Sequence, residues 1–370
     1  MDAPLSDIKV LDFSTLLPGP MASLILAETG ADMIKIERPD GGDGLRTYPP
    51  KWGDDSVSFA LLNRGKKSLA LDLKEPAARA RLLPFFRETD IVLEQFRPGV
   101  MDRLGLGYRD LIKIKPDLIY CAITGYGQSG SKRHRAGHDL NYIGDAGLLS
   151  LSMGTREQPV VPPALIADIA GGSYPAVMNI LLALRHRDRT GEGVFLDIAM
   201  TDNLFPFMFW ALGEGQATGR WPGNGQGALA GGSPRYQLYP TSDDETLTVA
   251  ALEEKFWKAF CEAIDLDPPL RNDASDPATT RQAIAEIIES KPADHWRRVF
   301  EDADCCCTIV QSIELAVSDA HFQARGLFDA KLKGSDGDTM AALPVPVAKV
   351  FRADPEDPQS APALGNNDDN

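Results

Sequence analysis

The stretch IKVLDFSTLLPGPMASLILAETGADMIKIE, residues 8–37, decides the fold class. It begins with a strand-like apolar run at residues 8–13, passes through the turn Pro18-Gly19-Pro20 into a helix-length segment at residues 20–29, and returns to a strand-like run at residues 33–37. A helix between two such strands is the pattern of a parallel βαβ unit. The stretch therefore predicts parallel strands with a helix packed on them.

The same alternation continues to about residue 127. Further strand-like runs lie at residues 68–73, 91–96 and 118–124, and helix-length segments lie at residues 75–87 and 108–114. These segments predict an α/β fold with an open, mostly parallel sheet covered by helices. In such sheets ligands bind beyond the carboxyl ends of the strands, so we expect a functional site there.

The rest of the chain divides into consecutive segments. Residues 138–187 are mostly helical in pattern, and eight glycines in residues 213–234 indicate a linker. Strands at residues 236–240 and 246–252 and three following helical segments indicate a small α+β domain. The predicted organisation is a large domain over residues 1–212, a linker over residues 213–234, a small domain over residues 235–325, a return to the large domain over residues 326–358, and a disordered tail over residues 359–370.

The composition is that of a globular protein. Hydrophobic residues make up 43% and charged residues 25% of the 370 residues, and the formal net charge is −15. Nearly all of the acidic excess lies in residues 241–370, so the large domain is close to neutral and can accept an anionic ligand. We expect no nucleic-acid partner, because the binding motifs are missing. No apolar run approaches roughly 18 residues and the amino terminus lacks a signal-peptide pattern, so we expect a cytoplasmic protein without a membrane partner.

The five cysteines form no recognisable ligand set. Cys121, Cys261 and the run Cys305-Cys306-Cys307 lack the C-x-x-C spacing of zinc and redox sites. We expect the run to form a buried strand, because free cysteine behaves as a small hydrophobe. A Walker phosphate loop and a dinucleotide-binding glycine motif are also absent from the sequence. We therefore expect no metal and no ATP or NAD cofactor.

Seven short motifs follow one another along the chain. They are LLPGP (16–20), GADMIKIERP (30–39), NRGKKSLALDLK (63–74), FRPGVM (96–101), GYGQ (125–128), GHDLNY (137–142) and ADIAGG (167–172). With these motifs in this order, the chain resembles the family III CoA-transferases, and within that group the α-methylacyl-CoA racemases. The resemblance runs from residue 8 to about residue 328.

The resemblance implies a fold as well as a chemistry. Family members have a large domain built around a Rossmann-like sheet, a small domain, and a homodimer in which two chains thread through each other like linked rings. Their active sites lie between the large domain of one subunit and the small domain of the other. The glycine-rich linker suits such an arrangement, because the chain must cross to its partner.

The resemblance also implies two catalytic groups, His138 and Asp168. Taken alone, His138 is better explained as a structural histidine that caps a helix beside Asp139, and an ordinary N-cap is the alternative for Asp168. In the racemase branch the histidine is a catalytic base, whereas a transferase usually has another residue there. Inverting a carbon α to a thioester requires removing a proton from one face and returning one to the other through an enolate, so a base is needed on each side.

Two further residues are implied around this pair. The backbone N–H of Asp139 is the implied donor to the enolate oxygen, because preorganised donors at a helix start stabilise such a charge. Glu253 matches a small-domain glutamate that hydrogen-bonds the catalytic histidine and orients it. From the residues alone, Glu253 is equally well explained as the plain N-cap of a helix over residues 254–264.

Coenzyme A, as part of the substrate, brings phosphates that basic side chains can bind. Arg38 and Arg97 match family positions that contact the coenzyme and rank first. The other expected contacts are Arg64, Lys66, Lys67 and Gly125. The alternative for any one of these cations is a solvated place on the surface.

These residues predict a racemase or epimerase that inverts the α carbon of 2-methylacyl-CoA thioesters. The alternatives are a CoA-transferase, in which Asp168 becomes an aspartyl-CoA thioester, and a non-catalytic CoA-binding relative. Residues 131–135, SKRHR, hereafter the basic loop, depart from the family pattern, in which proline is usual near this position. This loop could meet a coenzyme phosphate or a carboxylated acyl group.

Overall fold

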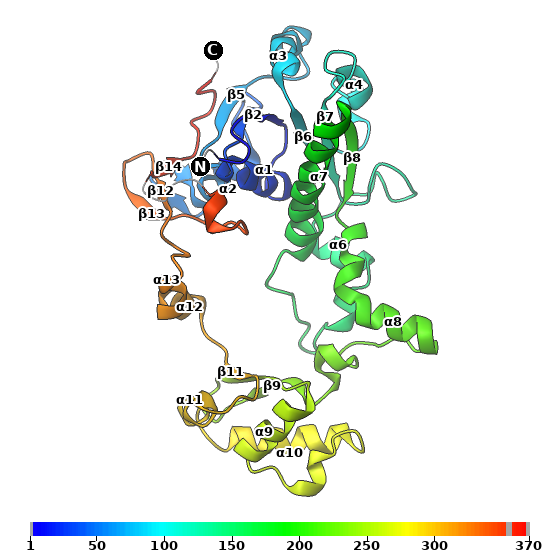
Figure 1. Ribbon diagram of the computed structural model, residues 1–370, viewed down its shortest axis with the longest axis vertical. Coiled ribbons are helices and arrows are strands. Elements are labelled where there is room, and N and C mark those ends of the chain that lie inside the picture. Colours follow the sequence, from blue (N-terminus) through cyan, green and yellow to red (C-terminus); the bar gives the residue numbers. More distant parts are fainter. Residues whose placement is uncertain (1–2, 353–356, 368–370) are drawn as a thin grey trace. The chain divides into compact units, whose positions relative to one another are not determined.

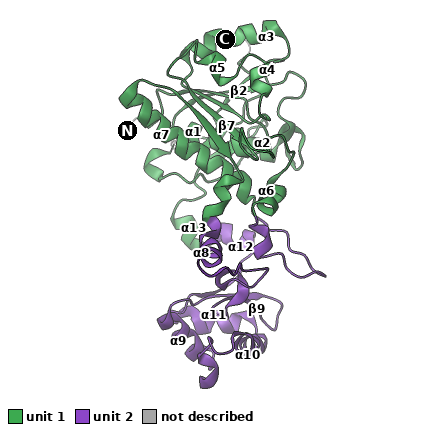
Figure 2. Cartoon of the chain, turned by 90° about the vertical axis from the view of Figure 1, so that its right-hand side faces the viewer, with its two compact units in different colours: residues 1–146, 164–206, 320–370 green, residues 147–163, 207–319 purple. Residues whose placement is uncertain are grey.

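The computed structural model describes residues 3–352 and 357–367 and divides into two compact units, which Figure 2 colours separately. Unit 1 comprises residues 1–146, 164–206 and 320–370, and unit 2 comprises residues 147–163 and 207–319. The sequence pattern places residues 147–163 in the large domain. In the structure these residues belong to unit 2, and the chain returns to unit 1 before it enters unit 2 again at residue 207. A prediction that divides the chain into consecutive segments does not include such a return.

Unit 1 contains a six-stranded sheet in which all neighbouring strands are parallel (Figure 1). The strand order is β5-β2-β1-β6-β7-β8. The strands are β1 (Lys9–Asp12), β2 (Asp32–Glu37), β5 (Lys67–Ala70), β6 (Ile91–Glu94), β7 (Ile119–Thr124) and β8 (Val194–Ala199). The α/β fold with a large parallel sheet, predicted from the alternation of strands and helices, is confirmed.

Helices cover both faces of this sheet. Leu11 and Phe13 pack in one core, where the rings of Phe13 and Phe86 stack. Asp12, between them, points to the opposite face, where its carboxylate accepts a hydrogen bond from the Ser23 hydroxyl. The helices of unit 1 are α1 (Pro18–Glu28), α2 (Val57–Asn63), α3 (Pro76–Glu88), α4 (Val100–Arg103), α5 (Tyr108–Leu111), α6 (Asp139–Asp145), α7 (Tyr174–Thr190) and α13 (Ala320–Ala324), with 3-10 turns at Gly44–Thr47 and Lys349–Phe351.

The carboxyl-terminal segment completes one edge of unit 1. The sequence predicts a disordered tail from residue 359, but Gln359–Ser360 forms β14, and the backbone N–H of Asn367 donates to the Ser68 carbonyl of edge strand β5 at 2.9 Å. The unpaired backbone groups of an edge strand explain this order, which the polar composition hides. Residues 368–370 of the predicted tail lie outside the described residues. The small strands of unit 1 are β3 (Lys51–Trp52), β4 (Asp55–Ser56), β12 (Lys331–Lys333) and β13 (Thr339–Ala341).

Unit 2 is built on an antiparallel sheet in the order β11-β10-β9. Its core contains Trp257, Phe260 and Trp296. Its elements are β9 (Tyr236–Pro240), β10 (Thr246–Ala250), β11 (Cys307–Ile309), α8 (Phe209–Thr218), α9 (Glu254–Ala263), α10 (Pro277–Glu289), α11 (Ala293–Glu301) and α12 (Ile313–Ser318), with short helical turns at Leu149–Leu151, Ala228–Gly232 and Pro268–Arg271.

Two expectations for unit 2 need correction. The predicted linker begins inside α8, so its first residues are helical rather than irregular. The cysteine run is not uniformly buried: Cys305 is buried, but Cys306 is exposed and has a positive φ of 55°. That backbone conformation turns the chain just before β11 and directs the middle thiol outward.

One helical stretch, Ala167–Thr190, is long and apolar enough to cross a membrane by length and composition. More than half of its most apolar window is buried inside the structure. The core helices of α/β domains pass the same test, and this stretch packs against β7 and β8 of the parallel sheet.

Candidate active site

A cavity of about 470 Å³ opens at the carboxyl edge of the sheet in unit 1. The loops that follow β1, β6, β7 and β8 form its walls, as expected for an open parallel sheet. His138 and Asp168, the two residues expected to be catalytic, both line it. The other lining residues are Leu16, Pro18, Gln95, Phe96, Arg97, Pro98, Thr124, Gly125, Arg133, Arg135, Ala136, Gly137, Asn141, Tyr142 and Met200.

Two glycines let the Tyr142 ring pack beside His138. A Cβ atom on Gly125 would lie 2.5 Å from Tyr142 Cε1, and one on Gly137 would lie 2.6 Å from the same atom. The Tyr142 hydroxyl donates to the Gly137 carbonyl at 2.5 Å. Glycine is therefore required at both positions, and the tyrosine fixes the backbone directly before His138.

His138 is the N-cap of α6. Its backbone N–H donates to Asn141 Oδ1 at 3.0 Å, and its side chain is exposed at the cavity. The residue thus has the position expected of a helix cap. Its imidazole nevertheless remains accessible to a ligand.

Asp139 joins the starts of two helical segments. Its side chain is 5% exposed, and its Oδ1 accepts the backbone N–H of Asp168 at 2.9 Å. Asp168 lies in the first turn of a π-type segment, Ala167–Ser173, which leads directly into α7. The sequence analysis assigns a role only to the Asp139 N–H, and no local signal reveals this bond, because its partners are 29 residues apart.

The surroundings of Asp168 favour its protonated form more than water would. Burial is the main cause and the nearby Asp139 carboxylate adds to it, while His138 opposes them; together they raise the pKa of Asp168 to about 6. Burial also raises the pKa of Asp139, although backbone hydrogen bonds to its carboxylate oppose the shift. Asp168 can therefore both accept and donate a proton near neutral pH.

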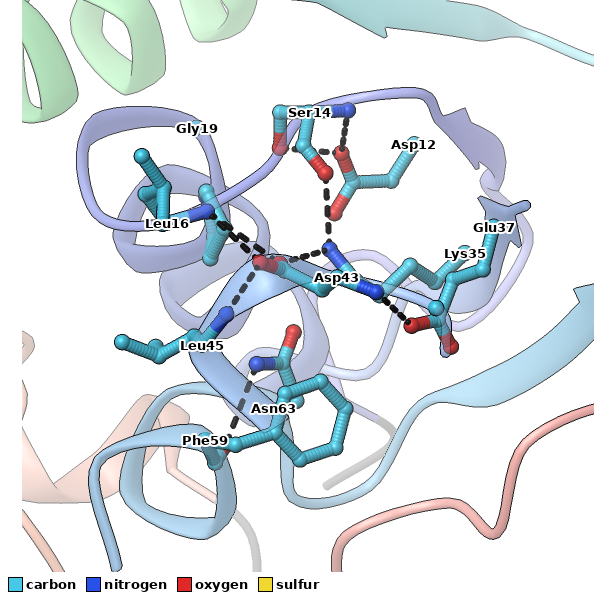
Figure 3. Close-up of polar contacts among 12 residues, drawn as sticks. Asp12, Ser14, Leu16, Gly19, Lys35, Glu37, Asp43, Leu45, Phe59 and Asn63 are labelled. Atoms are coloured by element: carbon cyan, nitrogen blue, oxygen red, sulfur yellow. Dashed lines mark hydrogen bonds and ion pairs between the residues drawn. The ribbon is translucent and has the colours of Figure 1, made fainter. Parts of the chain in front are cut away.

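A buried charge network holds the loop after β1 (Figure 3). Lys35 Nζ lies 3.0 Å from Asp43 Oδ2, and both side chains are fully buried. The same ammonium donates to the Ser14 carbonyl at 2.7 Å. Asp43 also accepts the backbone N–H groups of Leu16, at 3.1 Å, and of Leu45, at 3.0 Å.

This network fixes an unusual backbone conformation at the cavity. Leu16 has a φ of 62°, a left-handed conformation that costs a residue with a Cβ about 1 to 2 kcal/mol. The hydrogen bond from Leu16 to Asp43 holds this conformation where the residue lines the cavity. Leu16 belongs to the motif LLPGP, but the sequence patterns do not reveal its bond to Asp43, because the two residues are 27 positions apart.

The expected coenzyme contacts fall into two groups. Arg97 and Gly125 line the cavity. Arg38 is exposed and follows β2 at the same edge of the sheet, where its Nε donates to the Gly42 carbonyl at 2.9 Å. These three residues remain candidates for binding the coenzyme.

The other three expected contacts are corrected by the structure. Arg64 is 2% exposed and pairs with Glu28 at 2.7 Å, while its other nitrogens donate to carbonyl groups. Lys66 is buried among hydrogen-bond acceptors, and burial lowers its pKa to about 7. Lys67 pairs with Asp32 at 2.6 Å. Both residues are the first of their strands, so they lie at the amino ends of the strands, whereas the cavity lies at the carboxyl ends.

Glu253 lies in unit 2 as the N-cap of α9. Its side chain is exposed and makes no capping hydrogen bond. Glu253 therefore has the N-cap position of the plain interpretation, but its exposed carboxylate makes no hydrogen bond to its own helix.

The chain is similar to known proteins over nearly its whole length. A family model described as CoA-transferase family III matches residues 5–368. The chain is 35% identical to the alpha-methylacyl-CoA racemase of Homo sapiens over 88% of this chain and 82% of the relative, and 32% identical to the acetyl-CoA:oxalate CoA-transferase of Acetobacter aceti over 98% and 93%. It is similar to the crystal structure of a CAIB/BAIF family protein from Brucella suis, with a TM-score of 0.84, 26% identity, and coverage of 100% and 98%.

Proposed function

Because the chain belongs to CoA-transferase family III, we propose that it inverts the α carbon of 2-methylacyl-CoA thioesters by transferring protons between two bases. The observation that carries this proposal is that His138 and Asp168 line one cavity from the starts of two helical segments. Sequence identity does not choose between the activities, since racemases and transferases are about equally similar to this chain.

In the proposed reaction, one base removes the α proton from one face of the thioester and the other returns a proton to the opposite face. The base that starts protonated is the donor, and the roles exchange for the substrate of opposite hand. The raised pKa of Asp168 suits both roles. The N–H of Asp139, at the start of α6, is the proposed donor to the enolate oxygen, and such donors typically contribute about 3 kcal/mol.

Binding of the coenzyme is assigned to Arg97, Arg38 and Gly125. We further propose that the active enzyme is an interlocked homodimer. In that dimer, Glu253 in unit 2 of one subunit hydrogen-bonds and orients His138 in unit 1 of the other. The carboxylate of Glu253 makes no capping hydrogen bond and the imidazole of His138 is exposed, and both observations support this assignment. No further cofactor is required, because coenzyme A enters as part of the substrate.

The second candidate is CoA transfer through Asp168. Its carboxylate would attack the thioester carbonyl and release the CoA thiolate, leaving a mixed anhydride. The thiolate would then attack the aspartyl carbonyl and release the acid, giving an aspartyl-CoA thioester, and an acceptor acid would reverse these steps. The similarity to CoA-transferases supports this candidate, but the mechanism has no role for His138.

Proton exchange distinguishes the two reactions. The protein is incubated with one hand of a 2-methylacyl-CoA in deuterated water, and the α proton is followed by NMR. Exchange with loss of chirality is expected. Conversion of Asp168 to its hydroxamate by hydroxylamine, which releases CoA from the aspartyl thioester, would instead identify a transferase if it occurs with an acceptor acid present and without proton exchange. Coenzyme binding without either reaction would indicate a non-catalytic relative.

A further inference from the structure

The cavity that holds His138 and Asp168 carries an excess of positive charge. Three arginines line it: Arg97, from the loop after β6, and Arg133 and Arg135, from the basic loop between β7 and α6. Among the described residues that line the cavity, Asp168 is the single acid. Even a fully ionised Asp168 leaves three guanidinium groups in the cavity against one carboxylate.

The charges of the basic loop are only partly neutralised by its neighbours. Asp145 Oδ2 lies 3.4 Å from Lys132 Nζ and 3.2 Å from Arg135 Nη1, so one carboxylate faces two cations. Arg133 donates from Nε to His134 Nε2 at 3.0 Å. Within residues 3–352 and 357–367, neither Arg133 nor Arg97 forms an ion pair with a carboxylate.

Building on the proposed function, we propose that Arg133 and Arg135 form a subsite for a carboxylate at the far end of the acyl group. The substrates are then CoA monothioesters of short 2-methyl dicarboxylic acids. A guanidinium binds a carboxylate through two parallel hydrogen bonds, which fixes the orientation of the bound chain as well as its charge.

The position of the basic loop favours a carboxylate on the acyl group over a coenzyme phosphate. Arg135 precedes His138 by three residues, a span of at most about 11 Å. Arg133 and Arg135 also line the same cavity as His138, which is proposed to meet the α carbon, so an anion held by the basic loop can belong to the acyl group attached to that carbon. The coenzyme phosphates are separated from the thioester by the whole pantetheine arm, and Arg97 and Arg38 are available for them at the sheet edge.

The test compares two thioesters of the same hand. In 2-methylsuccinyl-CoA, with the methyl group beside the thioester, a carboxylate replaces the terminal methyl group of 2-methylbutanoyl-CoA. We expect α-proton exchange with a kcat/KM at least about tenfold higher for the carboxylated substrate. Arg133→Gln is expected to lower kcat/KM much more for 2-methylsuccinyl-CoA than for 2-methylbutanoyl-CoA, which abolishes most of this preference. Arg109→Gln, which removes an exposed arginine that does not line the cavity, is the matched control.

Binding of both thioesters and of free coenzyme A is measured by calorimetry with the same variants. If Arg133→Gln weakens all three ligands equally, the basic loop binds a coenzyme phosphate and the proposal is wrong. If the wild-type protein exchanges both thioesters equally well, the subsite is rejected while the proposed racemase activity stands. If neither thioester is exchanged, the proposed racemase activity fails. In that case the subsite is still supported if the wild-type protein binds the carboxylated thioester more tightly and this difference depends on Arg133. If the wild-type protein then binds both thioesters equally tightly, the subsite is rejected as well.

Discussion

At the scale of single residues, Asp139 connects the two groups proposed to move protons. It follows His138 directly in sequence, and its buried carboxylate holds the backbone of Asp168. The same negative charge contributes to the raised pKa of Asp168. Asp139 thus positions the backbone of the second base and adds to the effect of burial on its acidity.

Asp139→Asn separates these two effects, because the amide oxygen can still accept the Asp168 N–H. The Asp139 charge raises the pKa of Asp168, so its removal should lower that pKa. The part of the pH profile of kcat/KM that reports Asp168 should therefore move to lower pH. Asp188→Asn, an exposed change on α7, should leave the profile in place, and a shift to higher pH in Asp139→Asn would contradict the assignment.

His138→Ala distinguishes the two candidate reactions. We expect α-proton exchange to fall by about 10² to 10⁴-fold, the usual contribution of a general base. Transfer of CoA between acids, if present, should persist, because that mechanism uses Asp168 alone. His186→Ala, which removes an exposed histidine on α7, controls for the loss of an imidazole. Exchange at the wild-type rate in His138→Ala would eliminate the two-base mechanism.

At the scale of elements, the loop between β1 and α1 depends on a charge pair buried in unit 1. Asp43→Asn removes the carboxylate that pairs directly with the ammonium of Lys35, so that the buried Asp12 is the carboxylate that still acts on this charge. Removing one partner of a buried pair typically costs about 3 to 5 kcal/mol, because the remaining charge stays out of water. We expect a loss of this size in the free energy of unfolding, measured with urea, and a raised KM from disorder at Leu16.

The exposed pair of Asp32 and Lys67 provides the matched control. Both side chains are accessible to water although their atoms lie only 2.6 Å apart. Asp32→Asn should therefore change the free energy of unfolding by about 1 kcal/mol or less. If the two variants lose equal amounts of unfolding free energy, burial of the pair of Lys35 and Asp43 does not make it more important for stability than an exposed pair.

At the scale of the whole molecule, the sequence predicts the sheet and its site edge but not the bonds that join distant segments. The alternation of strands and helices is local, so residues 8–37 suffice to indicate a parallel sheet. The bonds from Asp139 to Asp168 and from Leu16 to Asp43 depend on tertiary folding. The tail was mispredicted for a related reason: its described part is held by the pairing of β14 with β12 and by the bond from Asn367 to β5, which its composition does not encode.

The proposed dimer can be tested by complementation between two inactive chains. If each active site combines unit 1 of one subunit with unit 2 of the other, a heterodimer of His138→Ala and Glu253→Ala chains contains one site with both mutations and one site with neither. Random assembly during co-expression should then restore roughly a quarter of wild-type exchange activity. Sites formed within single chains would each carry one mutation and stay inactive. Co-expressed chains that both carry His138→Ala provide the baseline, and activity at that baseline would reject a shared site.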